Sequence, residues 1–382
     1  MAVIKRHIRG IIKKLVILIL PVKNIGFFES VPDLSDNTKP VFDEMIRRGM
    51  NKKYKFVWLV KTKSSDLPKI KNVSYLARDD RFFAIKVFYY RYTSRFMFCC
   101  NNFLCTARNG QTSFYITHGT CIKSVRSYYN VPNKIDYTLV DGEPTREVMA
   151  YELNYALDRT VALGYPRNDI LVFSNYKSID LFPENKGEKI VVWYPTFRQH
   201  KSGHISAATK ALPILHDEKQ AEKLNEIAKE NKVLLVLKPH FAQDVSKIKA
   251  CELSNIKFID DEFFVKNNVT SYEFIAGCDA LLSDYSSVYY DYLLCDKPIG
   301  LVWEDYEEYK NTTNFAVDMD YNMKAGEKIY NIKDFEVFLK NLATGNDTLK
   351  AERAEISAWA NYARDGKSAE RVTDFIIEKA GL

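Results

Sequence analysis

The chain has 382 residues, of which 46% are hydrophobic, and it carries 55 Lys and Arg against 49 Asp and Glu. A chain of this length exceeds what one hydrophobic core usually supports, so two domains of about 150 to 200 residues each are expected. The net charge of +6 is a mild surplus that does not point to nucleic acid as a partner, and its position matters more than its size.

The positive charge is concentrated at the N-terminus. Residues 1–28 include no Asp or Glu, and the basic residues there are Lys5, Arg6, Arg9, Lys13, Lys14 and Lys23. Apolar residues recur beside them at helical spacing, which is typical of a helix lying on a membrane surface, so residues 1–22 are expected to form such a helix. Because it contains Lys13 and Lys14, the segment lacks the continuous apolar run that a membrane-spanning helix needs. Pro21-Val22-Lys23 shows no signal-peptide cleavage site. The structural alternative is a helix packed on its own domain.

Seven cysteines are scattered along the chain: Cys99, Cys100, Cys105, Cys121, Cys251, Cys278 and Cys295. Their odd number and their spacing match neither a disulfide framework nor a metal site. Most of them sit inside apolar runs, so buried free thiols in a reducing cytoplasm are expected.

The first half of the chain alternates apolar strand patterns with helical ones. Strands are expected at 24–29, 56–60, 73–77, 96–100, 114–117 and 135–140, and helices at 40–48, 81–93 and 145–156. This order favours a parallel sheet with helices on both faces, assigned to an N-terminal domain of residues 23–175.

A histidine and a glycine end the strand expected at 114–117. Ligands in open α/β sheets bind beyond the carboxyl ends of strands, and Gly119 lets a substrate approach the backbone. His118 is therefore a candidate general base, because its ordinary pKa lies near neutrality. A histidine that merely hydrogen-bonds at a strand end is the alternative.

The loop GYPRND, residues 164–169, offers Arg167 and Asp169 as a cation and an anion. These side chains could line a cleft or pin two domains together, and both interpretations remain open. Residues 177–189, which hold Pro183, Gly187 and many charges, are the best candidate for a linker.

The second half restarts the alternation of strands and helices. Strands are expected at 190–193, 233–237, 258–260, 280–282 and 298–302, and helices at 218–231, 271–277, 335–342, 352–363 and from 368 to near 379. His200 and His204 are four residues apart, but Gly203 between them indicates a loop instead of a metal-binding helix. A C-terminal domain of residues 188–362 is expected.

A phosphate site is the functional interpretation of two strand ends in this half. Ser283, Asp284, Ser286 and Ser287 form a polar turn between a strand and a helix, where backbone N–H groups and the helix dipole favour an anion. Lys238 and His240 follow the strand 233–237 and would add a charge and a hydrogen bond. An ordinary capped helix is the alternative for the turn taken alone.

Six segments occur in an order that resembles the CDP-glycerol glycerophosphotransferases, the teichoic acid and capsule polyol-phosphate transferases of bacteria. They are ITHGTCIK, GYPRNDIL, WYPTFR, LKPHF, LLSDYSSVYYDY and DGKSAERV. The resemblance implies a GT-B fold, with two Rossmann-like domains facing a central cleft and a last helix, 366–382, returning to the N-terminal domain.

The resemblance also implies an activity. Glycerol phosphate, or a related polyol phosphate such as ribitol phosphate, would pass from CDP-glycerol or another CDP-polyol to a hydroxyl of a lipid-linked saccharide or a growing polymer, releasing CMP. No tightly bound cofactor is implied, no motif predicts a metal, and a dependence on divalent cations is left open. The alternative is a GT-B glycosyltransferase that uses a nucleotide sugar, since a fold does not fix a function. The enzyme would act as a peripheral protein on the cytoplasmic face of the cell membrane, on an anionic membrane surface.

The roles implied for individual residues follow the same motifs. His118 and His240 would be catalytic. Donor-binding residues would be Arg198, Lys238, Ser283, Asp284, Ser286 and Ser287, and cleft or acceptor residues would be Gly119, Thr120, Lys123, Arg167 and Asp169. The chain departs from the family pattern at Cys121-Ile122, where Pro-Leu is common, at Thr117, where Trp is common, and at Thr312-Thr313-Asn314, where Arg-Gly is usual. These departures leave the acceptor open.

Overall fold

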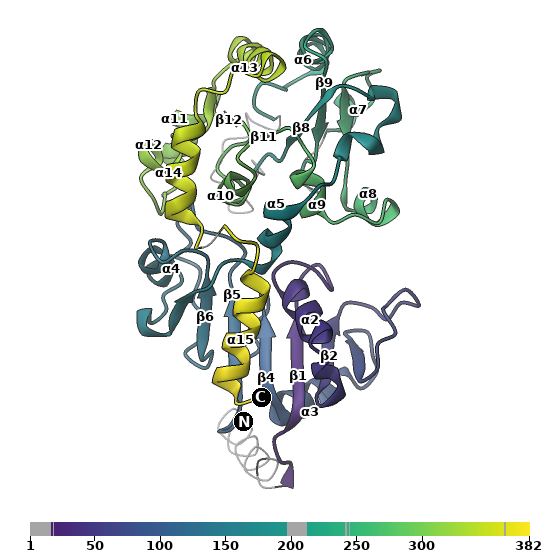
Figure 1. Cartoon of the computed structure of the whole chain (residues 1–382), viewed down its shortest axis with the longest axis vertical. Coiled ribbons are helices and arrows are strands. Elements are labelled where there is room, and N and C mark those ends of the chain that lie inside the picture. The colour runs from purple at the N-terminus through teal and green to yellow at the C-terminus, as the bar shows by residue number, and fades with distance from the viewer. Residues whose placement is uncertain (1–16, 18, 197–211, 241–242, 244, 363) are drawn as a thin grey trace, which may run out of the picture. The chain divides into compact units, whose positions relative to one another are not determined.

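A computed structural model describes residues 17, 19–196, 212–240, 243, 245–362 and 364–382 (Figure 1). It divides the chain into two compact units. The first comprises Met1–His118, Tyr128–Asp169 and Lys367–Leu382, and the second comprises Gly119–Ser127 and Ile170–Gly366. The helix predicted for residues 1–22 lies mostly outside the described residues. Within the part that is described, none of the helices has the length and apolar character needed to cross a bilayer.

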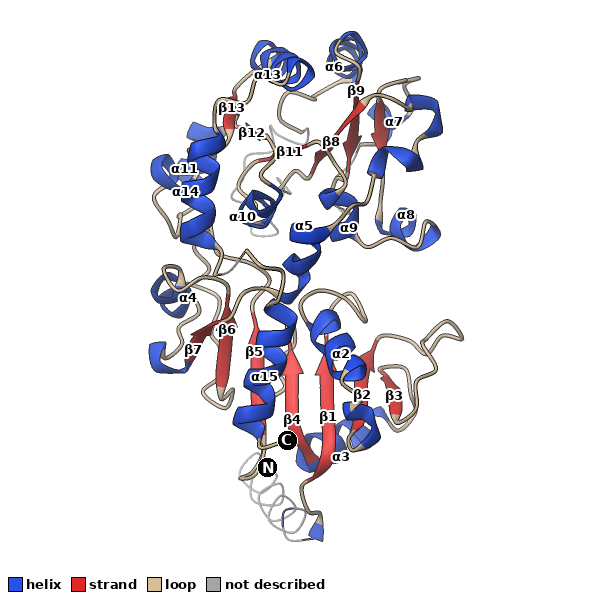
Figure 2. Cartoon of the chain, viewed as in Figure 1, coloured by secondary structure: helices blue, strands red, loops and turns tan. Residues whose placement is uncertain are grey.

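The first unit is built on a seven-stranded parallel sheet (Figure 2). Its strands, in sheet order, are β3 (Val73–Ala77), β2 (Lys55–Val60), β1 (Lys23–Glu29), β4 (Ser94–Cys99), β5 (Thr112–Ile116), β6 (Tyr137–Val140) and β7 (Thr160–Ala162). The strands are short, nearly continuous apolar runs because both faces of the sheet are covered.

Neighbouring residues of β1 show which helices cover each face. Phe28 packs with residues of α2 (Thr38–Arg47) and of the C-terminal helix α15 (Ser368–Ala380) in one core cluster. Phe27 belongs to a second cluster, against which α3 (Phe83–Thr93) packs. Successive side chains of a strand point to opposite faces, so α3 lies on the face away from α2 and α15. Helix α4 (Arg146–Glu152) follows β6.

The second unit is built on a six-stranded parallel sheet. Its strands, in sheet order, are β10 (Ile256–Phe258), β9 (Val233–Leu237), β8 (Lys189–Trp193), β11 (Ala280–Ser283), β12 (Ile299–Val302) and β13 (Glu327–Ile329). Val192 and Trp193 lie in two different core clusters, so this sheet also buries both faces. The helices are α5 (Asp169–Phe173, starting at the last residue of the first unit), α6 (Glu218–Glu230), α7 (Ser246–Lys249), α8 (Asp261–Lys266), α9 (Ser271–Ala276), α10 (Val288–Tyr292), α11 (Tyr306–Thr312), α12 (Met319–Asn322), α13 (Ile332–Thr344) and α14 (Lys350–Ala360).

Three segments differ from the expected organisation. Residues 119–127 and 170–175, placed in the N-terminal domain by the sequence, pack with the second unit. Residues 177–189, expected as a linker, belong to the second unit too: Ser178 is fully buried and donates a hydrogen bond to the carbonyl of Phe274 at 2.5 Å. None of the seven cysteines forms a disulfide, as predicted, but only Cys99, Cys100 and Cys278 are buried.

The C-terminal helix α15 packs on the first unit, where the GYPRND loop binds its first turn. Asp169 accepts hydrogen bonds from the backbone N–H groups of Ser368 and Ala369, both at 2.8 Å, and so caps the first turn of α15. Gly164 has φ +83°, and a Cβ at this position would overlap the Ser368 hydroxyl. A glycine is needed here both for its backbone conformation and for the close approach of the helix.

Replacing Gly164 with Ala should therefore reduce the free energy of unfolding by roughly 2 to 4 kcal/mol, because left-handed strain and steric overlap add together. Gly345→Ala is the matched control, since Gly345 also has a left-handed backbone (φ +74°) but has no atom within 4 Å of the point where a Cβ would lie. It should lose only about 1 kcal/mol. Urea unfolding of both variants measures the difference, and equal losses would contradict the packing argument.

Candidate active site

His118 follows β5 at the carboxyl edge of the first sheet and makes a defined hydrogen bond. Its Nδ1 lies 3.0 Å from Oδ2 of Asp36. A carboxylate can only accept, so Nδ1 carries the proton in the neutral ring and Nε2 keeps its lone pair. The side chain of His118 is 43% exposed and that of Asp36 is 13% exposed. The basic nitrogen is thus on an accessible ring that is oriented by a half-buried anion, which is the arrangement expected of a general base.

Arg167 holds the anion in place. Its Nη1 lies 2.7 Å from Oδ1 of Asp36, its Nη2 donates to the carbonyl of His118, and its backbone N–H donates to Oδ1 of Asn37 at 3.1 Å. Burial alone would raise the pKa of Asp36, but the charge of Arg167 and the hydrogen bond to His118 outweigh it and keep that pKa well below its ordinary value. Asp36 therefore stays ionised throughout the neutral range.

Other contacts fix the same strand end. The side-chain amide of Asn37 donates to the carbonyl of Thr117 at 3.0 Å, and the hydroxyls of Thr117 and Tyr165 are 2.5 Å apart. Three residues of the GYPRND loop thus have separate tasks. Tyr165 fixes the strand before His118, Arg167 fixes Asp36, and Asp169 caps α15.

The sequence did not identify Asp36 as a site residue. It stands 82 positions before His118 and just ahead of α2, in a segment where the sequence offers no sign of a site. The backbone of Asp36 is left-handed, with φ +54°. A residue other than glycine in this conformation is uncommon, and such residues gather at functional sites, so the geometry supplies a signal that the sequence lacks.

One group of three possible metal ligands occurs among the described residues. Ligand atoms of Asp36, Cys100 and His118 lie within 4.8 Å of one another. Burial and, to a lesser degree, the charge of Asp36 raise the pKa of the Cys100 thiol to about 12. Arg167 already neutralises the Asp36 carboxylate. The protonated thiol and the guanidinium favour a hydrogen-bonded base here over a preformed cation site.

The predicted phosphate turn lies at the carboxyl edge of the second sheet, after β11. Ser286 and Ser287 are partly exposed, and neither their hydroxyls nor their backbone N–H groups have a partner among the described residues. Tyr285 before them is anchored in the core, where its ring stacks on Tyr309 at 3.9 Å with an interplanar angle of 12°. The buried ring holds the turn while its two serines remain available to an anion.

Asp284 was predicted to bind the donor, but its carboxylate is engaged inside the protein. It accepts from the backbone N–H of Thr196 at 2.9 Å, from the Thr196 hydroxyl at 2.5 Å and from the backbone N–H of Tyr285 at 2.6 Å. Asp284 is also only 1% exposed. These contacts give it a positioning role, because they tie the chain after β8 to the turn after β11. Ser283 is likewise buried.

Lys238 and His240 follow β9 at the same edge of the second sheet. Strands β9 and β11 both flank β8, so these residues and the serine turn lie two strand spacings apart, roughly 10 Å. Lys238 Nζ lies 3.0 Å from Asp261 Oδ1, which partly balances its charge. Partial burial lowers the pKa of the exposed His240, and the positive charge of Lys238 lowers it further. The neutral imidazole is therefore favoured at pH 7. Arg198 lies outside the described residues.

The remaining predicted acceptor residues are in the second unit. Gly119 (φ +142°) turns the chain after His118, and Thr120 is buried. Lys123 forms an antiparallel bridge with Phe315, while the backbone N–H of Ala316 donates to the Ile122 carbonyl and that of Ser124 to the Asn314 carbonyl, both at 2.8 Å. Two of the departures from the family pattern, Cys121-Ile122 and Thr312-Thr313-Asn314, are therefore neighbours in the structure.

Comparison with known proteins gives the family. The sequence model of the CDP-Glycerol:Poly(glycerophosphate) glycerophosphotransferase family matches residues 13–378. The chain belongs to this family. The family indicated by the six motifs is thereby confirmed.

The relatives are polymerases and primases of teichoic acid. The chain is 24% identical over 368 residues to the teichoic acid ribitol-phosphate polymerase TarL of Staphylococcus aureus, which covers 90% of this chain and 60% of TarL. It is 23% identical over 343 residues to a teichoic acid poly(glycerol phosphate) polymerase of Bacillus spizizenii, with 82% of each protein covered. The chain thus spans less than two thirds of the length of TarL.

A solved structure shows the same fold. The wall teichoic acid polymerase TagF matches with a TM-score of 0.72 and 18% identity, over 98% of this chain and 97% of the TagF chain. A TagF variant soaked with CDPG matches with a TM-score of 0.71. The predicted GT-B fold class is confirmed by this likeness.

The orientation of His118 can be tested directly. In Asp36→Asn the neutral side-chain amide no longer imposes a proton on Nδ1, so we expect the Nδ1–H tautomer to lose its dominance. ¹⁵N NMR of histidine-labelled protein between pH 6 and 8 measures the tautomer, with His118→Asn used to assign the signal. Asp43→Asn, an exposed carboxylate that pairs with Lys39, is the matched control and should change nothing. An Nε2–H tautomer in the wild type would contradict the assignment.

Proposed function

We propose that the protein transfers glycerol phosphate, or a related polyol phosphate such as ribitol phosphate, from its CDP carrier to a hydroxyl of a lipid-linked or polymeric acceptor, with release of CMP. The observation that carries the proposal is the oriented His118–Asp36–Arg167 set within a chain that matches the glycerophosphotransferase family over residues 13–378. The names of the relatives, polymerases and primases of glycerol phosphate and ribitol phosphate, support both kinds of polyol.

In the proposed reaction, Nε2 of His118 takes the proton of the acceptor hydroxyl. The hydroxyl oxygen then forms a bond to the phosphorus of the polyol phosphate, while the bond from that phosphorus to the bridging oxygen of CMP breaks. Asp36 stabilises the imidazolium that results, because it stays ionised and already accepts the Nδ1 proton.

In the second unit, the proposal assigns the donor's phosphates to Ser286, Ser287, Lys238 and His240. The hydroxyls of Ser286 and Ser287, which have no partner in the part of the chain that the structure describes, supply hydrogen bonds. Lys238 supplies charge, and a neutral His240 donates one N–H to a phosphate oxygen or to the leaving CMP. Phosphoryl transfer depends mainly on positioning and on charge stabilisation, which this set provides.

The experiment measures CMP release from purified protein given CDP-glycerol, CDP-ribitol or a UDP-sugar, each with and without a lipid-linked polyol-phosphate acceptor. We expect acceptor-dependent CMP release with a CDP-polyol only. His118→Ala and His240→Ala should each lower kcat by roughly 10²-fold or more, the usual contribution of a general base or of a charge-stabilising donor. His216→Ala, a surface histidine paired with Glu304, is the matched control.

Two outcomes would contradict the proposal. Transfer from the UDP-sugar would favour the alternative, a glycosyltransferase that uses a nucleotide sugar. Full activity in both histidine variants would contradict the catalytic roles proposed for His118 and His240. A parallel series with EDTA and added Mg²⁺ decides whether a divalent cation takes part.

We also propose that the protein acts at the cytoplasmic face of the cell membrane, held there by its basic N-terminal segment. The support is the one-sided charge of residues 1–28 beside regularly spaced apolar residues. A lipid-linked acceptor would be presented at the same surface.

Deletion of residues 1–20 should weaken binding to anionic vesicles by at least tenfold, because several basic and apolar contacts are removed together. Vesicle co-sedimentation measures the binding, and hydrolysis of CDP-glycerol without vesicles serves as the control for folding and should persist. Equal sedimentation of the full chain and the shortened chain would rule out this anchoring role.

A further inference from the structure

Helix α3 of the first unit turns an apolar face toward solvent. Phe82 at its N-cap, Ile85 and Phe88 are 54%, 67% and 37% exposed. They are spaced by three residues, so they lie along one side of the helix. Single exposed apolar residues are ordinary on a protein surface, but three large ones aligned on one helix indicate a contact surface.

The other side of α3 already has its partner. Phe83, Val87 and Tyr90 pack on the core cluster beneath the helix, and the rings of Tyr90 and Phe27 lie 5.9 Å apart. The exposed side is therefore not a packing face of its own unit. We call Phe82, Ile85 and Phe88 the α3 face.

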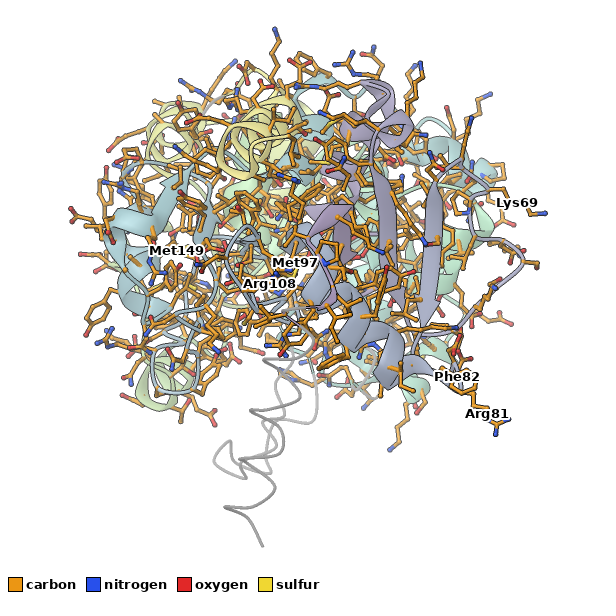
Figure 3. The ribbon with its side chains drawn as sticks, turned by 90° about the horizontal axis from the view of Figure 1, so that it is seen from below. Lys69, Arg81, Phe82, Met97, Arg108 and Met149 are labelled. Atoms are coloured by element: carbon orange, nitrogen blue, oxygen red, sulfur yellow. The ribbon has the colours of Figure 1, made fainter. Side chains whose placement is uncertain are left out.

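Basic residues occur in and beside the helix that carries the α3 face. The sequence has no Asp or Glu from Arg81 to Ile135. Cations in and beside the helix are Arg81, Lys86, Arg91 and Arg95, and the guanidinium of Arg81 lies 5.6 Å from the centre of the Phe82 ring. Figure 3 shows Arg81 and Phe82 projecting together at the rim of the unit. The nearby acids are Asp79 and Asp80, just before the helix, and Asp80 pairs with Lys86 at 2.6 Å.

Two lysine–tyrosine pairs extend this pattern at the end of the helix. Lys23 Nζ donates to the hydroxyl of Tyr89 at 2.8 Å, and Lys55 Nζ donates to that of Tyr90 at 3.2 Å. Tyr89 stands seven residues after Phe82 and so lies on the side of the α3 face, whereas Tyr90 packs on the core. The Lys23–Tyr89 pair is typical of a membrane–water interface, where aromatic rings sit at headgroup level and lysines reach the phosphates.

We propose that the α3 face is a second membrane contact, separate from the N-terminal segment, which inserts Phe82, Ile85 and Phe88 between the headgroups of an anionic bilayer while the surrounding cations bind lipid phosphates. The positive charge in and beside α3 favours an anionic bilayer over a second copy of the chain as the partner of this face. A twofold contact between two such faces would place Arg81 and Arg91 near their own copies, and like charges repel.

The test uses the full chain and vesicles of phosphatidylcholine alone or with about 30% phosphatidylglycerol, without donor or acceptor, so its result does not depend on the proposed reaction. The triple variant Phe82→Ser, Ile85→Ser, Phe88→Ser should bind anionic vesicles at least tenfold more weakly. The double variant Arg81→Gln, Arg91→Gln should lose about fivefold per residue on anionic vesicles and little on neutral ones.

Val337→Ser is the matched control, since Val337 is a lone apolar residue, 54% exposed, on α13 of the second unit. It should bind like the wild type. Thermal melting followed by circular dichroism checks that the triple variant is folded, which is expected because the substituted side chains are exposed.

The same variants are then made in the chain that lacks residues 1–20. If the α3 face contributes, the shortened chain should still bind anionic vesicles weakly. Its triple variant should bind them more weakly still. Unchanged vesicle binding in both triple variants would overturn the proposal. So would a triple variant that keeps its vesicle binding but changes from dimer to monomer in analytical ultracentrifugation.

Discussion

The hydrogen bond between His118 and Asp36 determines what the first unit can do chemically. A lone histidine at a strand end rotates and carries its proton on either nitrogen. Here the Asp36 carboxylate accepts from Nδ1 and leaves Nε2 with its lone pair, as the proposed general base requires. The carboxylate serves this purpose because Arg167 keeps it ionised against the effect of burial. Arg167 in turn belongs to the loop that fixes the strand through Tyr165 and the C-terminal helix through Asp169.

In the second unit, buried polar groups likewise fix the loops at the carboxyl edge of the sheet. Asp284 joins the chain after β8 to the turn after β11, and Tyr285 anchors that turn by stacking on Tyr309. Neither side chain needs to touch a substrate for this to matter. Their contacts hold Ser286 and Ser287 in place, and the hydroxyls of both serines have no partner among the described residues. In the proposed reaction, the phosphate of the donor would meet groups that need no rearrangement.

Regular secondary structure was predictable because its patterns are local. The five apolar residues of β9, Val233–Leu237, are unambiguous, and the strand expected at 73–77 coincides with β3. Strand β13 was missed, since Glu327–Ile329 is three residues long with two charges. Helix α11 lies in an acidic and aromatic stretch without a clear period, and α8 is only six residues long.

The candidate site was predictable only where the type of residue and its place at a strand end indicate a chemical role. His118 and the serine turn stood out at strand ends, whereas Asp36 did not, because its role depends on a partner 82 residues away. Asp284, predicted to bind the donor, and Asp169, predicted to line the cleft or pin two domains, both accept hydrogen bonds from backbone N–H groups, which no local pattern reveals. Residues 119–127 follow the second unit because they pair with 314–316, a non-local contact that no sequence period reveals.

A double-mutant cycle on kcat for acceptor-dependent CMP release tests most directly whether Asp36 acts through His118. The proteins are the wild type, Asp36→Asn, His118→Asn and the variant with both changes, at saturating donor and acceptor. If Asp36 acts by orienting His118 and stabilising its imidazolium, the double variant should be no slower than His118→Asn alone. Losses that multiply in the double variant would show that the two residues act independently and would contradict the account.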